Sequence, residues 1–456
     1  MLFNLAQSDR AAGVLLGLAC GDALGAGYRS GGPVPDDEFV TMTGGGSAGR
    51  TPGEWSDDTS MAIPITRAAA AGHDLRDEAV LADIARQWVE VGGAAPSRGR
   101  NAGSASLMRT APVALGYLED PDALAEAART LSDLTDDRAD AGDACVLWSL
   151  AVRHAIWNGE LQLRAGLDAL PADRRELWLA RIEEAEHLPL SAFVRTDEAV
   201  SALQGAWSSL THLFVVPEIG QTDADYLRQC IENAVQDGPG SGNVAALTGG
   251  LAGARWGATA VPAEWRRIVH GSPGLRATDL VRLSALAANG GAPDADGWPT
   301  AERFEYAAHG DLSALVRHPH DDGVWLGAVG ALDALPDEVD AVISLCRVGS
   351  AQVPARILDH IEVWMLEDED PENNPNLDFV LVDTVDEIAA LRAEGHVVLV
   401  HCVQGQCCTA TIAALYASRH RGVPMPRAMA DIELALPGSH RGPAGAAESG
   451  TSDDSD

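Results

Sequence analysis

The sequence predicts a multidomain protein in which a large all-α domain precedes a smaller α/β domain. Two observations lead to this prediction. Helical periodicity dominates up to about residue 289, and short β-branched runs alternate with helical patterns after that point. A chain of 456 residues is also long enough for two or three domains with full hydrophobic cores.

Amphipathic or buried helices are expected throughout the first domain. Apolar residues recur at helical spacing in four segments, which are Leu75–Val91, Pro121–Leu131, Ala141–Asn158 and Tyr226–Gln236. Hydrophobic residues make up 46% of the chain and aromatic residues only 5%, with many Ala, Gly and Leu. Small and aliphatic side chains of this kind suit close helix packing, so composition and periodicity agree.

A turn-rich acidic stretch, Asn289 to Pro299, is the best candidate for a linker. Beyond it, strands at Ala341–Leu345 and Val397–Val400 are separated by a helical pattern at Leu381–Ala393, which predicts a parallel or mixed sheet. The last residues are rich in Gly, Ser and Asp without apolar periodicity, so we expect a disordered acidic tail. The predicted parts are a helical domain (8–288), a connector (289–319), an α/β domain (320–436) and the tail (437–456).

The charge of the chain restricts its partners. All 32 basic residues are Arg, against 67 Asp and Glu, and the net charge of −35 repels nucleic-acid backbones and anionic membranes. No apolar run approaches the ~20 residues that a membrane span needs, and the first residues lack the features of a signal peptide. Seven scattered Cys do not form a small-domain disulfide pattern. We therefore expect a cytoplasmic protein that binds neither nucleic acid nor membrane.

The most informative segment reads Gly-Glu-Trp-Ser-Asp-Asp-Thr-Ser-Met, from residue 53 to residue 61. It places the hydroxyl of Ser56 beside the adjacent carboxylates of Asp57 and Asp58, at the start of an apolar helix. Mg²⁺ and Mn²⁺ prefer oxygen ligands, and one turn of backbone can supply several of them here. The same residues would also suit a helix cap, with Ser56 or Asp57 capping a helix that begins near Thr59.

Four further blocks accompany this segment, at residues 12–25, 106–113, 243–254 and 261–265. In this order and spacing, over roughly residues 10 to 275, the chain resembles the ADP-ribosylglycohydrolase family. The resemblance implies an all-helical domain with a two-magnesium site that cleaves an N- or O-glycosidic bond of an ADP-ribose-like group. It assigns Ser56, Asp57 and Asp58 to the first metal motif, although the family usually has Thr at the first of these positions.

The second metal motif departs from the family. An Asp-Thr-Asp-Thr block is expected before the Val-Ala-Ala helix, but residues 240–243 read Gly-Ser-Gly-Asn. Ser104-Ala105 stands where the family tends to have Asn-Gly, and Asp136 where it tends to have His. Divalent binding depends on the charge and number of the ligands, so we expect one weakly held ion, Mg²⁺ or else Mn²⁺, anchored by Asp57 and Asp58. Asp22 is a further candidate to support the metal shell.

The second chemical signal is the loop from His401 to Thr409, between a buried strand and a helix at Thr411–Ser418. Backbone N–H groups and the helix dipole in such a loop bind phosphate and lower the pKa of a thiol. Over roughly residues 320–436 the chain resembles dual-specificity, or Cys-based, protein phosphatases. The resemblance implies Cys402 as the nucleophile that forms a phosphocysteine and Thr409 as the hydroxyl that assists its breakdown. Asp368 or Asp370 would be the general acid.

Cys408 occupies the position at which this phosphatase signature has Arg. Arg clamps the phosphoryl group through two hydrogen bonds, and losing such a clamp costs ~2–4 kcal/mol of transition-state stabilisation. Efficient phosphatase turnover is therefore not expected, and the loop suits phosphate binding or a structural role. Reversible oxidation of Cys402 with Cys407 or Cys408 is a further interpretation.

A lesser candidate lies before Val324-Trp325, where His318 and His320 precede Asp321 and Asp322. These side chains could bind a metal, and a polar turn explains them equally well.

The leading functional hypothesis is a magnesium-assisted hydrolase of ADP-ribosyl or related nucleotide-ribosyl groups. Asp57 and Asp58 would hold Mg²⁺ against the ribose hydroxyls and position the attacking water. Its partner would be an ADP-ribosylated protein or an ADP-ribose-like small molecule, with a phosphate ligand at the Cys402 loop. The alternative is a pseudoenzyme that binds ADP-ribose or a phosphorylated ligand without turnover. A third hypothesis is a phosphatase that uses Cys402.

Overall fold

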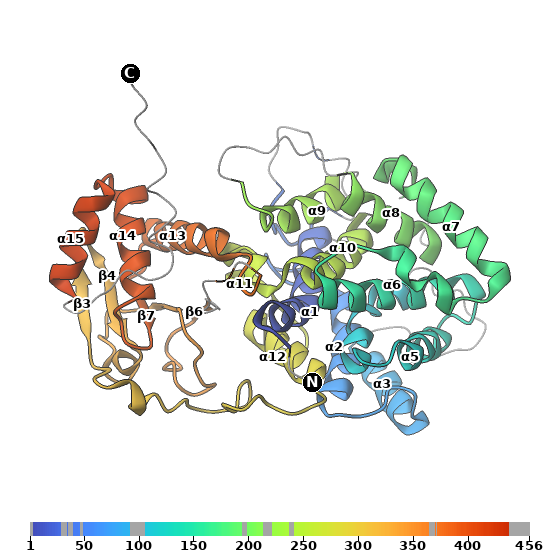
Figure 1. Cartoon of the computed structure of the whole chain (residues 1–456), viewed down its shortest axis with the longest axis horizontal. Coiled ribbons are helices and arrows are strands. Elements are labelled where there is room, and N and C mark those ends of the chain that lie inside the picture. The colour runs from blue at the N-terminus through green and yellow to red at the C-terminus, as the bar shows by residue number, and fades with distance from the viewer. Residues whose placement is uncertain are drawn as a thin grey trace, which may run out of the picture. The chain divides into compact units, whose positions relative to one another are not determined.

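The computed structural model describes residues 3–28, 34, 40–45, 49–91, 105–193, 198–212, 221–236, 241–363, 370 and 372–436. The chain divides into two compact units, and the boundary in the sequence falls between Pro293 and Asp294 (Figure 1). The first unit is helical and the second contains a mixed α/β sheet, so the predicted fold class is confirmed. None of the helices in the described part of the chain is long and apolar enough to cross a bilayer.

The first unit is built from twelve α-helices among the described residues. They are α1 Leu5–Ala26, α2 Asp57–Ala70, α3 Glu78–Glu90, α4 Ala105–Met108, α5 Pro121–Asp133, α6 Ala139–Asn158, α7 Ala172–His187, α8 Ala199–Thr211, α9 Asp225–Gln236, α10 Ser241–Trp256, α11 Ala263–Ile268 and α12 Ala277–Ala288. Four short 3₁₀ helices and a small hairpin, β1 His270–Gly271 and β2 Leu275–Arg276, complete it. The four helices predicted from periodicity correspond to α3, α5, α6 and α9.

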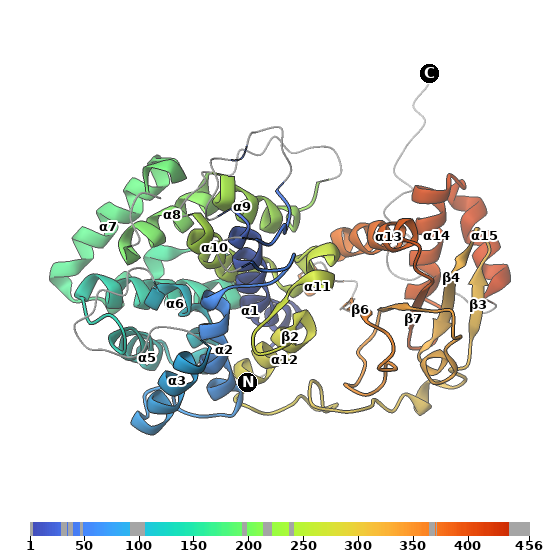
Figure 2. The ribbon, with the colours of Figure 1, turned by 180° about the vertical axis from the view of Figure 1, so that it is seen from behind.

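Helix α1 lies at the centre of this unit, side by side with α10 (Figures 1 and 2). Glycines on both helices bring the two backbones together. A Cβ on Gly17 would lie 2.2 Å from the carbonyl oxygen of Gly249, and one on Gly21 would lie 2.0 Å from that of Ala245. Only a residue without a side chain permits this approach, so the small residues in the two sequence blocks set the helix spacing.

The second unit contains one five-stranded sheet in the order β3-β4-β7-β5-β6. The strands are β3 Leu315–His318, β4 Asp321–Ala328, β5 Ala341–Ser344, β6 Asp359–Glu362 and β7 Val398–Cys402. Strands β3 and β4 form an antiparallel hairpin, and the other neighbours are parallel. The described part of this unit also contains three α-helices, which are α13 Leu377–Glu394, α14 Cys408–Arg421 and α15 Met425–Ala435. Strand β3 and the break between the units both fall within residues 289–319.

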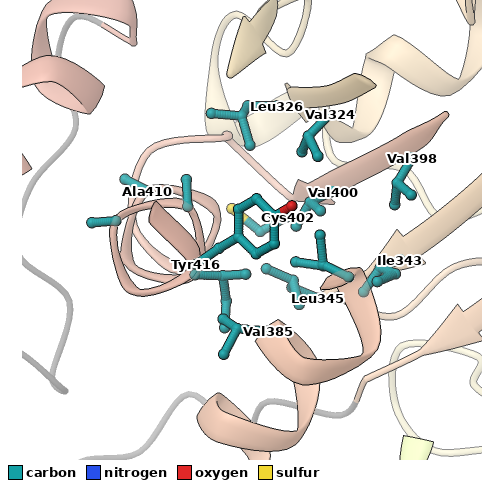
Figure 3. Packing of buried hydrophobic residues seen from close by; sticks show 14 of the residues in the cluster. Val324, Leu326, Ile343, Leu345, Val385, Val398, Val400, Cys402, Ala410 and Tyr416 are labelled. Atoms are coloured by element: carbon teal, nitrogen blue, oxygen red, sulfur yellow. The ribbon is translucent and has the colours of Figure 1, made fainter. Parts of the chain in front are cut away.

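Two apolar clusters cover the two faces of this sheet. Alternate residues of β7 belong to different clusters. Val400 packs with Ile343 and Tyr416 on the face that the three helices cover (Figure 3). Leu399 packs with Val342 in the cluster on the other face. Parallel strands covered on both faces are expected to be apolar throughout. This explains the unbroken β-branched runs, and it leaves the carboxyl ends of the strands as the place for polar chemistry.

Candidate functional site

The turn before α2 is held by the β1 strand and by a left-handed glycine. Gly53 has a φ of 82°, and a Cβ there would lie 2.3 Å from the carbonyl oxygen of Ile268, so only glycine fits. The backbone N–H of Trp55 donates to the carbonyl of His270 at 3.0 Å. The turn therefore presents Ser56 as the N-cap of α2, and the helix begins two residues earlier than the expected start near Thr59.

The side chain of Asp22, on α1, holds this turn in place through hydrogen bonds. Its buried carboxylate accepts hydrogen bonds from the N–H and the hydroxyl of Ser56, at 2.9 and 2.5 Å. It also accepts from the N–H and the hydroxyl of Thr59, at 3.0 and 2.8 Å. Hydrogen bonds to a charged acceptor in a buried site are strong. Asp22 therefore fixes the residues on either side of the acid pair.

The two carboxylates of the pair differ in exposure. Asp57 and Asp58 are the first two residues of α2, where the partial positive charge of the helix end favours acidic side chains. Asp57 is exposed, whereas Asp58 is only 7% exposed. The structure thus brings Ser56, Asp57 and Asp58 together on one turn, with one carboxylate open to solvent and the other against the interior.

Arg109, which follows α4, carries a buried charge in the neighbourhood of Asp58. The residue is 1% exposed, its guanidinium lies 3.9 Å from the ring centre of Trp88, and one nitrogen donates to the hydroxyl of Thr135 at 2.6 Å. Burial lowers the pKa of Arg109 to about 10, while the negative charges of Asp58 and Asp136 favour the charged form. Its Nε and Nη1 have no hydrogen-bond partner among the described residues. Arg109 was not among the predicted site residues, and the only signal for it in the sequence is an Arg within an apolar block.

The beginning of α10 reaches the same end of α1. Gly25 lies one helical turn after Asp22, and a Cβ on Gly25 would lie 2.7 Å from the Cα of Gly242. Gly240 and Ser104, two positions of departure from the family, lie outside the described residues. Gly242, in the described part of the altered block, and the turn that carries the acid pair thus both contact the carboxyl-terminal turns of α1.

The donors present suit a hard cation only in part. Among the described residues, no group of three or more His, Cys, Asp or Glu side chains is arranged to hold a metal ion. The Ser56 hydroxyl and the carboxylates of Asp57 and Asp58 are oxygen donors, as Mg²⁺ and Mn²⁺ require. Two carboxylates supply little charge, so a single weakly held ion stays our prediction.

In the second unit, the loop between β7 and α14 is fixed against β4. Gly405 has a φ of 73°, and a Cβ there would lie 3.0 Å from the carbonyl of Gly327. The buried hydroxyl of Thr409 donates to the same carbonyl at 3.4 Å. The carbonyl of Val403 accepts from the N–H of Val329 at 3.1 Å. This loop therefore has the strand, loop and helix order that the sequence predicts.

Cys402 ends β7 and lies beside the first turn of α14, near Ala410 (Figure 3). Its side chain is 5% exposed. Hydrogen bonds from the Cys408 thiol, the Thr409 hydroxyl and the backbone N–H groups of Thr409 and Gly405 lower the pKa of Cys402 to about 5, against the effect of burial. These hydrogen bonds therefore favour the thiolate form of Cys402.

A polar chain lies directly before this cysteine. One ring nitrogen of His401 is 2.7 Å from the hydroxyl of Ser344, which is 3.0 Å from a ring nitrogen of His360. The other His401 nitrogen lies 4.0 Å from the sulfur of Cys346. Burial lowers the pKa of His401 to about 4, so the ring is neutral at neutral pH. These contacts could not be predicted from the sequence, because the residues come from three separate strands or strand ends.

The predicted general acid is not placed by the structure, since Asp368 lies outside the described residues. The other candidate, Asp370, accepts a hydrogen bond from the backbone N–H of Glu372 at 3.0 Å and so caps its own turn. The acid assignment stays a prediction.

Comparisons with known proteins agree with the helical unit. The family model described as ADP-ribosylglycohydrolase matches residues 4–295. The chain is 28% identical over 282 residues to the ADP-ribosyl-(dinitrogen reductase) glycohydrolase of Rhodospirillum rubrum. The matched region covers 56% of this chain and 89% of that protein. It is also 27% identical over 295 residues to the ADP-ribosylarginine hydrolase Tri1 of Pseudomonas putida. That match covers 56% of this chain and 73% of the relative.

Two solved structures with some similarity to the chain have TM-scores below 0.5. An ADP-ribosylglycohydrolase-related protein complex is 26% identical, covers 62% of this chain and 99% of that chain, and gives a TM-score of 0.49. Human DUSP28 is 20% identical, covers 29% of this chain and 88% of that chain, and gives a TM-score of 0.25.

Proposed function

The chain belongs to the ADP-ribosylglycohydrolase family, and we propose that its helical unit hydrolyses the glycosidic bond of an ADP-ribosyl group. The observation that carries the proposal is the turn of Ser56, Asp57 and Asp58, clamped by four hydrogen bonds to buried Asp22. Two relatives act on ADP-ribosylated dinitrogen reductase and on ADP-ribosylarginine, as their names state. ADP-ribosylarginine is therefore the substrate to test first.

Asp57 and Asp58, with the Ser56 hydroxyl, would hold one Mg²⁺ or Mn²⁺. When bound, such an ion supplies positive charge that orients the ribose hydroxyls and stabilises negative charge in the transition state. We assign different roles to the two carboxylates because they differ in exposure to solvent. Asp57 faces solvent and can accept hydrogen bonds from water or substrate, whereas Asp58 is buried and fixed. Arg109 keeps a positive charge beside Asp58 and so balances its charge when no ion is bound.

The test is release of ADP-ribose from ADP-ribosylarginine with and without Mg²⁺. We expect slow, metal-dependent release that Asp57→Asn and Asp58→Asn abolish. Asp122→Asn is the matched control, because Asp122 is also an exposed acid in the first turn of a helix, α5, and it should leave the rate unchanged. Release that is independent of metal, or that survives in both site variants, would contradict the proposed roles.

A binding module without turnover is the second candidate, and the altered block at the start of α10 favours it. Gly240 and Gly242 replace two expected carboxylates, and Gly242 packs against Gly25. If charge limits turnover, Gly240→Asp with Gly242→Asp should raise hydrolysis above that of the natural chain. Tight binding of ADP-ribose with no hydrolysis in either protein would favour the binding module.

For the second unit, the bent loop and the start of α14 favour weak binding of an oxyanion by backbone N–H groups near Gly405. Cys408, in the Arg position, cannot clamp a phosphoryl group, so aryl phosphate hydrolysis should be near background. Cys408→Arg should raise it at least tenfold, which corresponds to ~1.4 kcal/mol of barrier. Robust activity of the natural chain that disappears in Cys402→Ser would instead support the phosphatase hypothesis.

A further inference from the structure

Arg109 is a buried cation that has no direct ion pair among the described residues. The residue is 1% exposed, and its Nε and Nη1 make no hydrogen bond within the same part of the chain. Burial of a charge without a compensating partner is costly. A negative charge elsewhere in the core is therefore needed to offset the guanidinium.

A series of contacts joins Arg109 to helix α2, which carries the acid pair. The guanidinium lies 3.9 Å from the ring centre of Trp88, and the indole N–H of Trp88 donates to the carbonyl of Met61 at 2.8 Å. Met61 follows Asp58 by three residues, so the two lie on the same side of α2, one turn apart. The Nη2 group donates to the hydroxyl of Thr135 at 2.6 Å, just after α5. The guanidinium is thus fixed next to the helix turn that bears Asp58.

The acidic groups around Arg109 do not all carry a charge that is available to it. Against the effect of burial, Cys145, Asp58 and Asp136 favour its charged form. Burial raises the pKa of the Cys145 thiol, which is therefore neutral at neutral pH. Asp136 already accepts two hydrogen bonds from the guanidinium of Arg138, at 2.8 and 2.6 Å. Of these three groups, Asp58 is left to offset the charge of Arg109, and it is only 7% exposed.

We propose that Arg109 is a positioning residue of the candidate metal site, whose guanidinium is the internal counter-charge of Asp58 and competes with a divalent ion for that carboxylate. The competition rests on the proposed metal-assisted function, whereas the pairing of charges concerns the protein without metal. An ion bound by Asp58 would repel the guanidinium, because both are positive. Weak binding of one ion then has a second cause, besides the carboxylates that are missing at residues 240 and 242.

The first experiment measures the coupling between Arg109 and Asp58 in the full-length chain without metal. Urea unfolding, followed by hydrogen exchange of peptides from α1 and α10, compares Arg109→Met, Asp58→Asn and the double variant. Met removes the charge and keeps an apolar contact with Trp88. Each single change leaves one buried charge without its counter-charge, so each should destabilise the helical unit. The Asp58 change should raise the unfolding constant at least tenfold less in Arg109→Met than in the wild type.

The matched control for this cycle is Asp57→Asn combined with Arg109→Met. Asp57 neighbours Asp58 but is exposed, so the two losses should simply add. Additive losses for Arg109 and Asp58 would overturn the proposal. If Arg109→Met does not fold, addition of Asp58→Asn should restore folding, and failure of this rescue would overturn the proposal as well.

The second experiment titrates Mg²⁺ by calorimetry. Arg109→Met should bind Mg²⁺ at least tenfold more tightly than the wild type although it is less stable, and Arg109→Lys, which keeps the charge, should bind as weakly as the wild type. Arg181→Met is the matched control, because Arg181 also lies over a Trp ring, that of Trp178 at 4.7 Å, but on α7. It should leave Mg²⁺ binding unchanged.

A merely structural role of Arg109 predicts a different result. Loss of packing alone would weaken Mg²⁺ binding in Arg109→Met or leave it unchanged, and either result would overturn the competition. If neither the wild type nor Arg109→Met binds Mg²⁺, the proposed metal-assisted function and the competition both fail. The stability cycle then decides by itself whether Arg109 is the counter-charge of Asp58.

Discussion

The hydroxyl of Ser56 donates to the carboxylate of Asp22 at 2.5 Å, which joins the acid-bearing turn to the central helix α1. The same carboxylate accepts from Thr59, three residues later. The start of α2 is thus fixed before any ligand arrives. Asp22 acts on the candidate site through the residues that flank Asp57 and Asp58.

Replacement of Asp22 by Asn should therefore destabilise the helical unit. The amide would direct N–H groups toward donors, and buried donors without acceptors would remain, at a cost of roughly 3 kcal/mol. Urea unfolding followed by circular dichroism measures the loss. Asp122→Asn, a change of the same kind on an exposed helix start, should leave the midpoint unchanged. Equal midpoints for the two variants would show that the clamp does not stabilise the fold.

Gly17→Ala should separate the two central helices. The new Cβ would lie 2.2 Å from the carbonyl oxygen of Gly249, and overpacking of this kind costs about 2 kcal/mol or more. Gly116→Ala is the matched control, because its nearest contact is the Cβ of Ala69 at an ordinary 3.5 Å. Thermal unfolding should show a clear loss for the first variant and almost none for the second. The reverse order would contradict the close packing of α1 on α10.

Metal binding should reflect the two carboxylates that remain. We expect calorimetric titration to show one Mg²⁺ or Mn²⁺ ion bound weakly, and Asp57→Ala or Asp58→Ala to abolish binding. Asp122→Ala serves as the control for loss of a surface charge. Two tightly bound ions in the natural chain, or tight binding in Asp57→Ala, would show that further ligands exist.

The reactivity of Cys402 should follow its low pKa. Alkylation by iodoacetamide requires the thiolate, so the rate should fall as the pH drops through about 5 and should be constant near pH 7. An ordinary cysteine would gain reactivity only near pH ~8.5. Cys408→Ala removes the leading hydrogen bond and should move the midpoint upward, whereas Cys407→Ala should not. A midpoint that stays the same in Cys408→Ala would assign the shift to the backbone N–H groups and Thr409 instead.

Much of the fold could be predicted from periodicity alone. The segment Ala141–Asn158 became α6 and the run Ala341–Leu345 became β5, because both are buried through nearly their whole length and carry an unambiguous pattern. The hairpin of β3 and β4 could not be predicted. A turn does lie between His318 and Asp321, as the polar-turn interpretation expects. The sequence did not indicate that both residues are buried, or that Asp321 accepts a hydrogen bond from Tyr416, ninety-five positions later.

Some residues of the candidate sites could likewise be predicted from the sequence, and others could not. Ser56, Asp57, Asp58 and Cys402 are local motifs, and their neighbours in sequence are also their neighbours in space. Arg109 is different, because Trp88 and Thr135 come from distant helices and only the packed core brings them together. A sequence shows that a polar residue stands within an apolar segment. It does not show the partners of that residue, because these depend on the tertiary structure.

Single-turnover release of ADP-ribose from ADP-ribosylarginine decides whether the helical unit is the slow, metal-assisted hydrolase that we propose. With enzyme in excess and Mg²⁺ present, the wild type should release ADP-ribose, and Asp58→Asn should release none under the same conditions. Asp122→Asn should match the wild type. If the wild type releases no ADP-ribose at any Mg²⁺ concentration while it still binds the substrate, the proposed hydrolysis is wrong and the unit is a binding module.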